Sequence, residues 1–140
     1  MAGSVAVTKH YVSHNGGVLV VKLACIGDIA GGTVGTVPAT QITNANIGAI
    51  GYQTDYHMMG YYLTEVWTIG GAVLPDAADI TITDELACVL YTEVNVIAAS
   101  TTPKAGTLSA YRIVTSLLTM TVANQATASA EWDVYLKLVR

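Results

Sequence analysis

Charged side chains are scarce in this sequence. Only 11% of its 140 residues are charged, against about 25% in an ordinary soluble domain. Much of the surface must therefore consist of Thr, Ser, Asn, Gly and Ala, which protect a free monomer poorly against association. We expect a protein that works packed against copies of itself or against a partner.

The few charges form no patch of one sign. The net charge is −4, and the six basic residues are scattered along the chain. Proteins that bind nucleic acids by neutralising phosphates gather Lys and Arg on one face. The distribution therefore argues against nucleic acid as a partner.

Long apolar runs are also missing. The longest apolar segments, 17–26 and 86–91, are shorter than the ~20 residues that a membrane-spanning helix needs. Residues 1–14 lack the basic segment followed by an apolar segment that marks a signal peptide. We therefore expect no membrane partner, and a protein that is made and kept in a cytoplasm until it is assembled elsewhere.

No motif of a common catalytic or cofactor site is present. The sequence contains no GxSxG, GxxxxGKS/T, HExxH or CxxC. His10 and His14 lie on a predicted strand and in the turn after it, so their spacing does not direct both rings at one ion, and a metal site needs three or four ligands. We expect no metal, no cofactor and no catalytic residue, and hence no enzyme.

Two pairs of acidic residues could suggest chemistry, but both occupy predicted turns. They are Asp76/Asp79 and Asp84/Glu85. Asp is favoured in turns because its carboxylate accepts hydrogen bonds from nearby backbone N–H groups. Local turn structure therefore accounts for both pairs better than a calcium site or a glycosidase pair does.

Cysteine is rare as well. The two cysteines, Cys25 and Cys88, each lie inside an apolar run, where a free cysteine behaves as a small hydrophobic residue. We expect both to be buried and reduced, while their spacing alone leaves a disulfide open.

The apolar residues that are present alternate with polar ones rather than following the 3.6-residue period of a helix. Alternation with a period of two is typical of β-strands. It predicts strands over the following segments: 4–12, 18–26, 62–69, 79–83, 108–114, 116–123 and 131–139.

The two tryptophans belong to two of these strands. In segment 62–69, strict alternation places Trp67 on the same face as Leu63, and in segment 131–139 it places Trp132 among the inward residues. Large aromatic side chains on inward positions dominate the packing of a core. We expect both tryptophans to be core anchors.

These elements predict a single all-β domain over residues 1–140. About seven to nine strands in a chain of this length favour an antiparallel β-sandwich or a jelly-roll-like barrel. Segment 27–60 interrupts the strand pattern with seven glycines. We expect it to be one long glycine-rich insertion. Excursions of this length in a compact domain are usually functional or interacting segments, so we expect this one to contact a neighbour.

A cluster of aromatic residues and methionines at the end of this insertion is the best candidate site. Tyr and Met are enriched at protein–protein interfaces, and the glycine-rich flank favours exposure. The open alternative is that the cluster packs inside the domain as an edge of the core. The candidate interface residues are Tyr52, Tyr56, His57, Met58, Met59, Tyr61 and Tyr62.

Several stretches together resemble a group of small structural proteins of tailed bacteriophages. The chain begins MAGSVAVTK, carries VWTIGGAVLPDAADITITDELACVL at 66–90, and continues with LTMTV at 118–122 before a small-residue turn and a last strand with a terminal basic residue. The matches cover roughly half of the chain in pattern. They are positional rather than catalytic, and segment 27–60 departs from the pattern.

The resemblance implies a virion component. A head decoration or cement protein is the first expectation, bound to the major capsid protein or other virion proteins, with a homo-oligomer such as a dimer or trimer. A tail or head–tail connector protein is the closest alternative. A carbohydrate-binding β module displayed on a virion is a further alternative, because tyrosines can stack on sugars, and a small hydrolase ranks last.

Overall fold

The protein is built from β-strands. The computed structural model describes residues 2–30, 33–43 and 58–140, and within these ranges there is no α-helix. The bounds of the strands are β1 Ser4–Val12, β2 Val18–Ile26, β3 Thr40–Ile42, β4 Tyr62–Gly70, β5 Asp79–Thr83, β6 Val89–Glu93, β7 Lys104–Ala105, β8 Arg112–Ile113, β9 Leu118–Ala123 and β10 Glu131–Val139.

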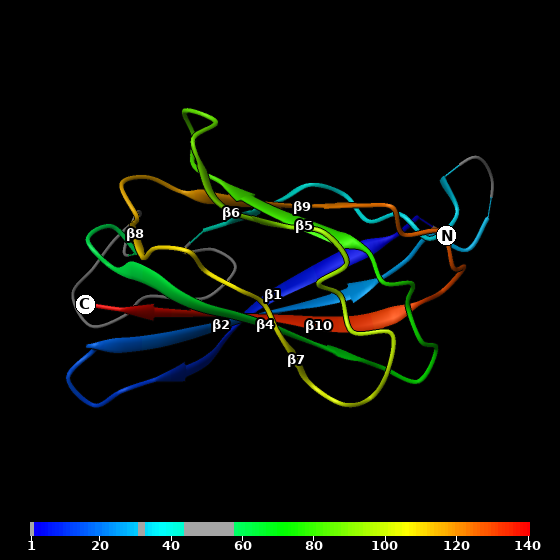
Figure 1. Ribbon diagram of the computed structural model, residues 1–140, viewed down its shortest axis with the longest axis horizontal. Helices are drawn as coiled ribbons and strands as arrows, with labels where there is room; N and C mark the ends of the chain where they lie inside the picture. The colour runs from blue at the N-terminus through cyan, green and yellow to red at the C-terminus, as the bar shows by residue number, and fades with distance from the viewer. Residues whose placement is uncertain (1, 31–32, 44–57) are drawn as a thin grey trace.

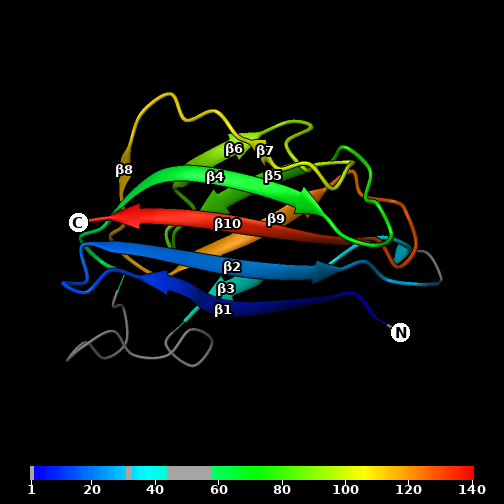
Figure 2. The same cartoon turned by 90° about the horizontal axis from the view of Figure 1, so that it is seen from below.

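The strands form two antiparallel sheets that face each other (Figures 1 and 2). The first, sheet A, has the order β1-β2-β10-β4-β7, and β8 also pairs with β4. The second, sheet B, has the order β3-β9-β5-β6. The prediction of an all-β antiparallel chain is confirmed.

The alternating apolar residues fill the space between the sheets. β10 contributes Trp132, Val134, Leu136 and Leu138, each at most 2% exposed, as its alternation predicts. Because every second side chain of a strand points to the same face, one nine-residue strand supplies four core residues. The other large residues that are fully buried include Leu19, Leu23, Ile80, Ile82, Ile97, Leu118 and Met120.

The prediction for Trp67 is wrong, because β4 contains a bulge. Lys137 of β10 pairs with Glu65, but the next residue, Leu138, pairs with Leu63, so Thr64 is an extra residue in β4. Because side chains alternate between the two faces of a sheet, an extra residue moves every later side chain of the strand to the opposite face. Val66 and Thr68 therefore point into the core, and Trp67 lies on the outer face of sheet A.

Part of the predicted insertion belongs to the core. β3 pairs with β9, and Ile42 and Met58 are at most 1% exposed. Gly35 has φ +79°, and a Cβ atom there would lie 2.4 Å from the backbone of Ala126, so only glycine fits this approach. Segment 27–60 therefore includes structural residues, while its positions 31–32 and 44–57 lie outside the described residues.

The predicted strand 108–114 is mostly irregular. Only β8, a pair of residues, bonds to β4 at Tyr62 and Leu63, whereas β7 bonds further along β4 at Trp67 and Thr68. Between β7 and β8 the chain leaves the sheet, and Gly106 and Leu108 line a groove beside β4. The sequence carries apolar residues here, but the bulged β4 offers no continuous edge for them to pair with.

Thr68 is a fully buried polar side chain that bonds to two backbone groups, and we expect its loss to destabilise the domain. Its hydroxyl donates to the Val96 carbonyl at 2.9 Å and accepts from the Ala98 N–H at 2.8 Å. Thr68→Val keeps the shape but leaves both backbone groups without this partner. We expect a loss of about 1–3 kcal/mol in the free energy of unfolding by urea titration. Thr81→Val, at a surface hydroxyl pair with Thr92, is the control and should cost much less.

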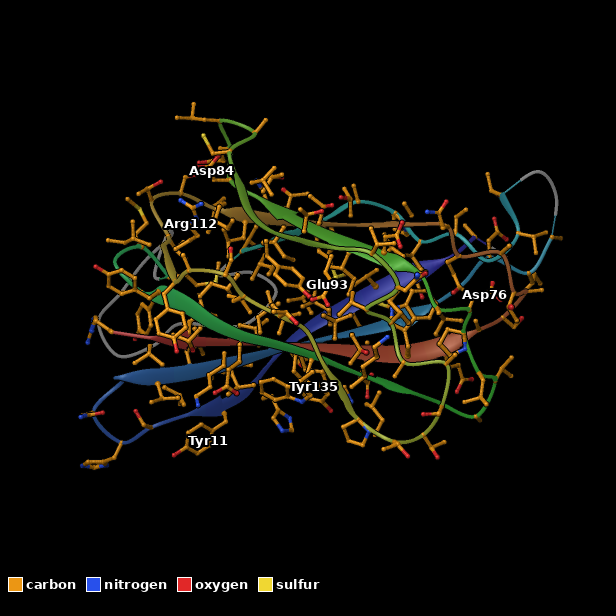
Figure 3. The ribbon with its side chains drawn as sticks, in the orientation of Figure 1. Tyr11, Asp76, Asp84, Glu93, Arg112 and Tyr135 are labelled. Carbon is orange, nitrogen blue, oxygen red and sulfur yellow. The ribbon has the colours of Figure 1, made fainter. Side chains whose placement is uncertain are left out.

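Asp76 joins the corner before β5 to the turn before β10 (Figure 3). Its carboxylate accepts from the N–H groups of Ala126 at 2.9 Å and Thr127 at 3.0 Å. These bonds favour the charged form, and they hold the pKa of Asp76 below its ordinary value.

A lowered pKa in the folded state makes stability depend on pH. The contribution of Asp76 is present above the unfolded pKa of about 3.9 and is lost as the pH falls through the folded pKa. Asp76→Asn should therefore cost about 1 kcal/mol at pH 7, since the site is partly exposed, and the difference from the wild type should shrink below pH 4. Thermal melts across pH 2.5–7 measure this. A constant difference at every pH would contradict it.

Candidate interaction surfaces

The structure divides the predicted Tyr/Met cluster into buried and exposed members. Met58 and Tyr61 are buried, at 1% and 0% exposure, so they serve the core rather than a partner. Met59 and Tyr62 are 46% and 45% exposed and remain available for contact. The other candidates of the cluster lie outside the described residues, namely Tyr52, Tyr56 and His57.

Tyr61 has a clear structural role. Its hydroxyl donates a hydrogen bond to the carbonyl of Gly16 in the β1–β2 turn. The Arg140 guanidinium lies 5.2 Å from the centre of its ring, within the range of a cation–π contact. Tyr61 thus ties the start of β4 to the first hairpin and to the end of the chain.

The exposed members of the cluster belong to a larger apolar group at one end of the sheets. Tyr62 pairs directly with Ile113 of β8, and cross-strand neighbours of this kind pack side by side. Ile113 is 48% exposed and Tyr111, just before β8, is 67% exposed. Met59 precedes Gly60, whose N–H donates to the Val114 carbonyl at 2.8 Å. Met59, Tyr62 and Tyr111 therefore lie beside β8, to which Ile113 belongs.

The β5–β6 hairpin adds two residues to this end and projects from sheet B (Figure 1). Leu86 at its tip is 82% exposed and Val89 is 51% exposed. The Asp84 carboxylate accepts from the N–H groups of Leu86 and Cys88, both at 2.9 Å. The loop is therefore held in shape while it presents a leucine to solvent.

Hydrogen bonding joins the hairpin to the β8 region. The Glu85 N–H donates to the Ser116 hydroxyl at 3.1 Å, and a crevice of about 150 Å³ is lined both by β6 and by residues 107–110 and 112. Figure 3 shows Asp84 and Arg112 at the same end of the molecule. We call this surface the β8 end; its residues are Met59, Tyr62, Leu86, Val89, Tyr111 and Ile113.

A second apolar group lies where β2 and β4 end. Ile26 of β2 pairs with Glu131, and the Gly71 N–H donates to the Glu131 carbonyl at 2.7 Å, so both loops meet at the start of β10. The C-terminal ends of β2 and β4 lie at the opposite end of the molecule from β8 in Figure 2. We call this surface the β2 end; its exposed residues, each 39–44% exposed, are Ile26, Ile29, Val73 and Leu74.

Several charges on the outer face of sheet A are paired with each other. Lys22 lies 2.9 Å from Asp133, and Lys137 lies 2.9 Å from Glu65. The hydrogen bond to Asp133 raises the pKa of Lys22, so the Lys22 ammonium stays charged at neutral pH. Such exposed pairs add about 0–1 kcal/mol each, and they leave the surface close to locally neutral.

The two cysteines differ in burial. Cys25 is buried, as predicted, and its burial raises the pKa of its thiol. Cys88 is exposed, so the prediction that it is buried is wrong. Within the described ranges, no three His, Cys, Asp or Glu side chains gather as a metal site would require. No helix in this part of the chain is long and apolar enough to cross a membrane.

Comparisons of the chain with protein families, with curated proteins and with solved structures gave no match. The candidate surfaces therefore rest on geometry alone. Sequence reasoning missed Leu86, Val89, Tyr111 and Ile113, since each lies in an apolar segment that could equally have been buried. The one available signal was the turn chemistry of Asp84, which places Leu86 at a hairpin tip.

Proposed function

We propose that this protein is a structural component of a tailed bacteriophage virion, and that it decorates the assembled head as a cement protein. It would bind the major capsid protein and stabilise the shell through protein–protein contacts, with no catalysis and no cofactor. The resemblance at residues 66–90 and 118–122 motivates this role. The proposed scaffold is a β-sandwich with segment 27–60 inserted between β2 and β4.

The observation that carries the proposal is the placement of exposed apolar residues at two opposite ends of the sheets. The β8 end exposes six large hydrophobic or aromatic residues and the β2 end exposes four. Isolated surface hydrophobes are normal, but groups of them mark contact sites. Two groups at opposite ends suit a module that touches two neighbours at once and so bridges them.

A bridging module gains strength from the lattice that it binds. When one end is bound, the other end meets its partner at a high effective concentration. Each contact can therefore be small, and the scarcity of charge (11% of residues) limits the number of charged groups that would lose water on binding. Self-association as a dimer or trimer would multiply the same effect.

The copy number in purified particles tests the position in the virion. For a decoration protein we expect a number of the same order as that of the major capsid protein, measured by quantitative mass spectrometry of intact heads. A few copies per particle would instead place the protein in the tail or the head–tail connector. Absence from purified particles would overturn a virion role altogether.

A further inference from the structure

A groove on the outer face of sheet A shares only Tyr111 with the β8 end and no residue with the β2 end. It has a volume of about 500 Å³ and opens beside β4, where the chain leaves the sheet between β7 and β8. This volume lies within the range of about 300–1,000 Å³ that is usual for small-molecule sites. Its lining includes Thr64, Glu65, Trp67, Ala105, Leu108 and Tyr111.

One wall of the groove is the indole of Trp67. The β4 bulge turns this side chain outward, where it stacks on Tyr135 with ring centres 5.2 Å apart and planes 6° from parallel. Figure 3 shows Tyr135 on the side of sheet A that faces away from sheet B. Tyr135 is on β10, so it covers the indole face on that side and leaves the opposite face turned toward β7.

The position opposite Trp67 on β7 keeps that face open. Trp67 pairs with Ala105, whose side chain is a single methyl group. Beyond it, Leu108 and the exposed Tyr111 form the far wall of the groove. The indole face and the Tyr111 side chain therefore border the same slot.

The far wall of the slot is held in place before any ligand arrives. The Gly106 N–H donates to the Val66 carbonyl at 2.8 Å, and the Glu93 carboxylate accepts from the Thr107 N–H at 2.6 Å and from the Tyr91 hydroxyl at 2.7 Å. A Cβ atom at Gly106 would collide with the Tyr91 oxygen. Such a preorganised wall lowers the ordering cost of binding.

The Trp67 indole is also braced on its covered side. Tyr135 contacts His10 edge-on, with ring centres 5.0 Å apart, and the Lys22 ammonium lies 5.8 Å from the Tyr135 ring centre. The aromatic stack therefore cannot easily turn away. A rigid aromatic platform loses little entropy when a flat ligand settles on it.

The polar groups at the slot determine which ligand fits. Glu65 lines it with its carboxylate 2.9 Å from the Lys137 ammonium, so an acceptor and a donor stand together at its rim. The negative net charge of the chain and this carboxylate disfavour anionic ligands. β7 and β8 occupy the β4 edge on either side, so a peptide strand has no room to pair there.

We propose that this slot binds a neutral saccharide, with one sugar ring stacked on the free face of Trp67 and its hydroxyl groups bonded to the Glu65–Lys137 pair. The C–H groups on one face of a pyranose form an apolar, slightly positive surface, which matches the negative face of an indole. Its hydroxyls both donate and accept, which matches a carboxylate beside an ammonium. The site shares Tyr111 with the β8 end, but the proposal does not rest on the role in the virion.

The first test is binding of the full-length protein to an array of neutral hexose and N-acetylhexosamine oligosaccharides. Sulfated oligosaccharides and a proline-rich peptide are tested in parallel as alternative ligands. The strongest neutral ligand is then titrated while tryptophan fluorescence is followed. The chain has two tryptophans and Trp132 is buried, so a change in emission reports on Trp67. We expect saturable binding with a dissociation constant of millimolar or lower.

Three variants locate the site. Trp67→Ala removes the platform, and Ala105→Leu fills the slot from an exposed position on β7 without altering Trp67; each should weaken binding at least tenfold. Tyr11→Ala removes another exposed aromatic side chain of sheet A, which does not line the slot, and should bind normally. Circular dichroism melts check that the variants are folded.

The remaining outcomes would overturn the proposal. They are no neutral oligosaccharide bound at millimolar concentration, binding that survives Ala105→Leu, or binding of the sulfated oligosaccharides or the proline-rich peptide alone. The Ala105→Leu result decides the matter even if Trp67→Ala fails to fold. None of these outcomes alters the copy-number test of the virion role.

Discussion

Replacing Leu86 with Ser and Val89 with Thr together is expected to weaken binding of the purified protein to phage heads at least tenfold. Leu86 is 82% exposed and Val89 is 51% exposed, so the two changes remove apolar contact area at the β8 end without opening the core. A tenfold loss corresponds to about 1.4 kcal/mol, which is less than the value of two apolar side chains buried in an interface. Cosedimentation with heads that lack the protein measures it.

The controls separate contact from stability. The double variant should unfold within about 0.5 kcal/mol of the wild type, as exposed substitutions usually do. Val94→Thr is the matched control, because Val94 is 69% exposed but belongs to neither apolar end. Leu74→Ser, at the β2 end, should weaken binding as well. Unchanged binding after changes at both ends would contradict bridging through these surfaces.

Replacing Trp132 with Ala is expected to cost about 3–5 kcal/mol, which is a large part of the stability of a domain of this size. Trp132, near the start of β10, is 2% exposed and belongs to the core, so truncation leaves a cavity between the sheets. Urea titration followed by circular dichroism should show a much lower midpoint concentration of urea, or a protein that is unfolded without urea.

The matched variant for this prediction is Trp67→Ala. The same side chain is lost, but from the outer face of sheet A, where only the stack on Tyr135 and partial burial are removed. We expect a cost of about 1–2 kcal/mol. Equal costs for the two tryptophans would contradict the bulge at Thr64, because strict alternation would have buried both.

The strands with clean alternation could be predicted from the sequence. Segments 4–12, 18–26, 79–83 and 131–139 have the predicted bounds in the structure. Burial follows the side-chain period of two throughout 79–83 and 131–139, as with Ile80 and Ile82 at 0% exposure. Local pattern and tertiary packing agree in these segments, so the pattern alone was sufficient.

The facing of β4 could not be predicted. The bulge at Thr64 depends on the register of β10 against β4, and register is a property of two strands that are far apart in the sequence. Nothing within segment 62–69 marks the extra residue. For the same reason the sequence did not indicate that Ile42, in the glycine-rich segment, completes the core beside β9.

The candidate surfaces were predictable only in part. The sequence singled out Met59 and Tyr62, which are exposed, but it placed Tyr61 in the same group although its hydroxyl bonds to the β1–β2 turn. Apolar composition cannot separate exposed from buried residues where alternation is lost. The slot beside Trp67 was hidden from the sequence because it is made by the bulge and by the departure of the chain between β7 and β8.

The most direct measurement is an electron cryomicroscopy map of the intact particle. We expect density for the two sheets on the outer surface of the head, with the β8 end, including Leu86, against one capsid subunit and the β2 end, including Leu74, against its neighbour. Density for this protein at the tail or connector alone, or on the head with both ends free in solvent, would contradict the account.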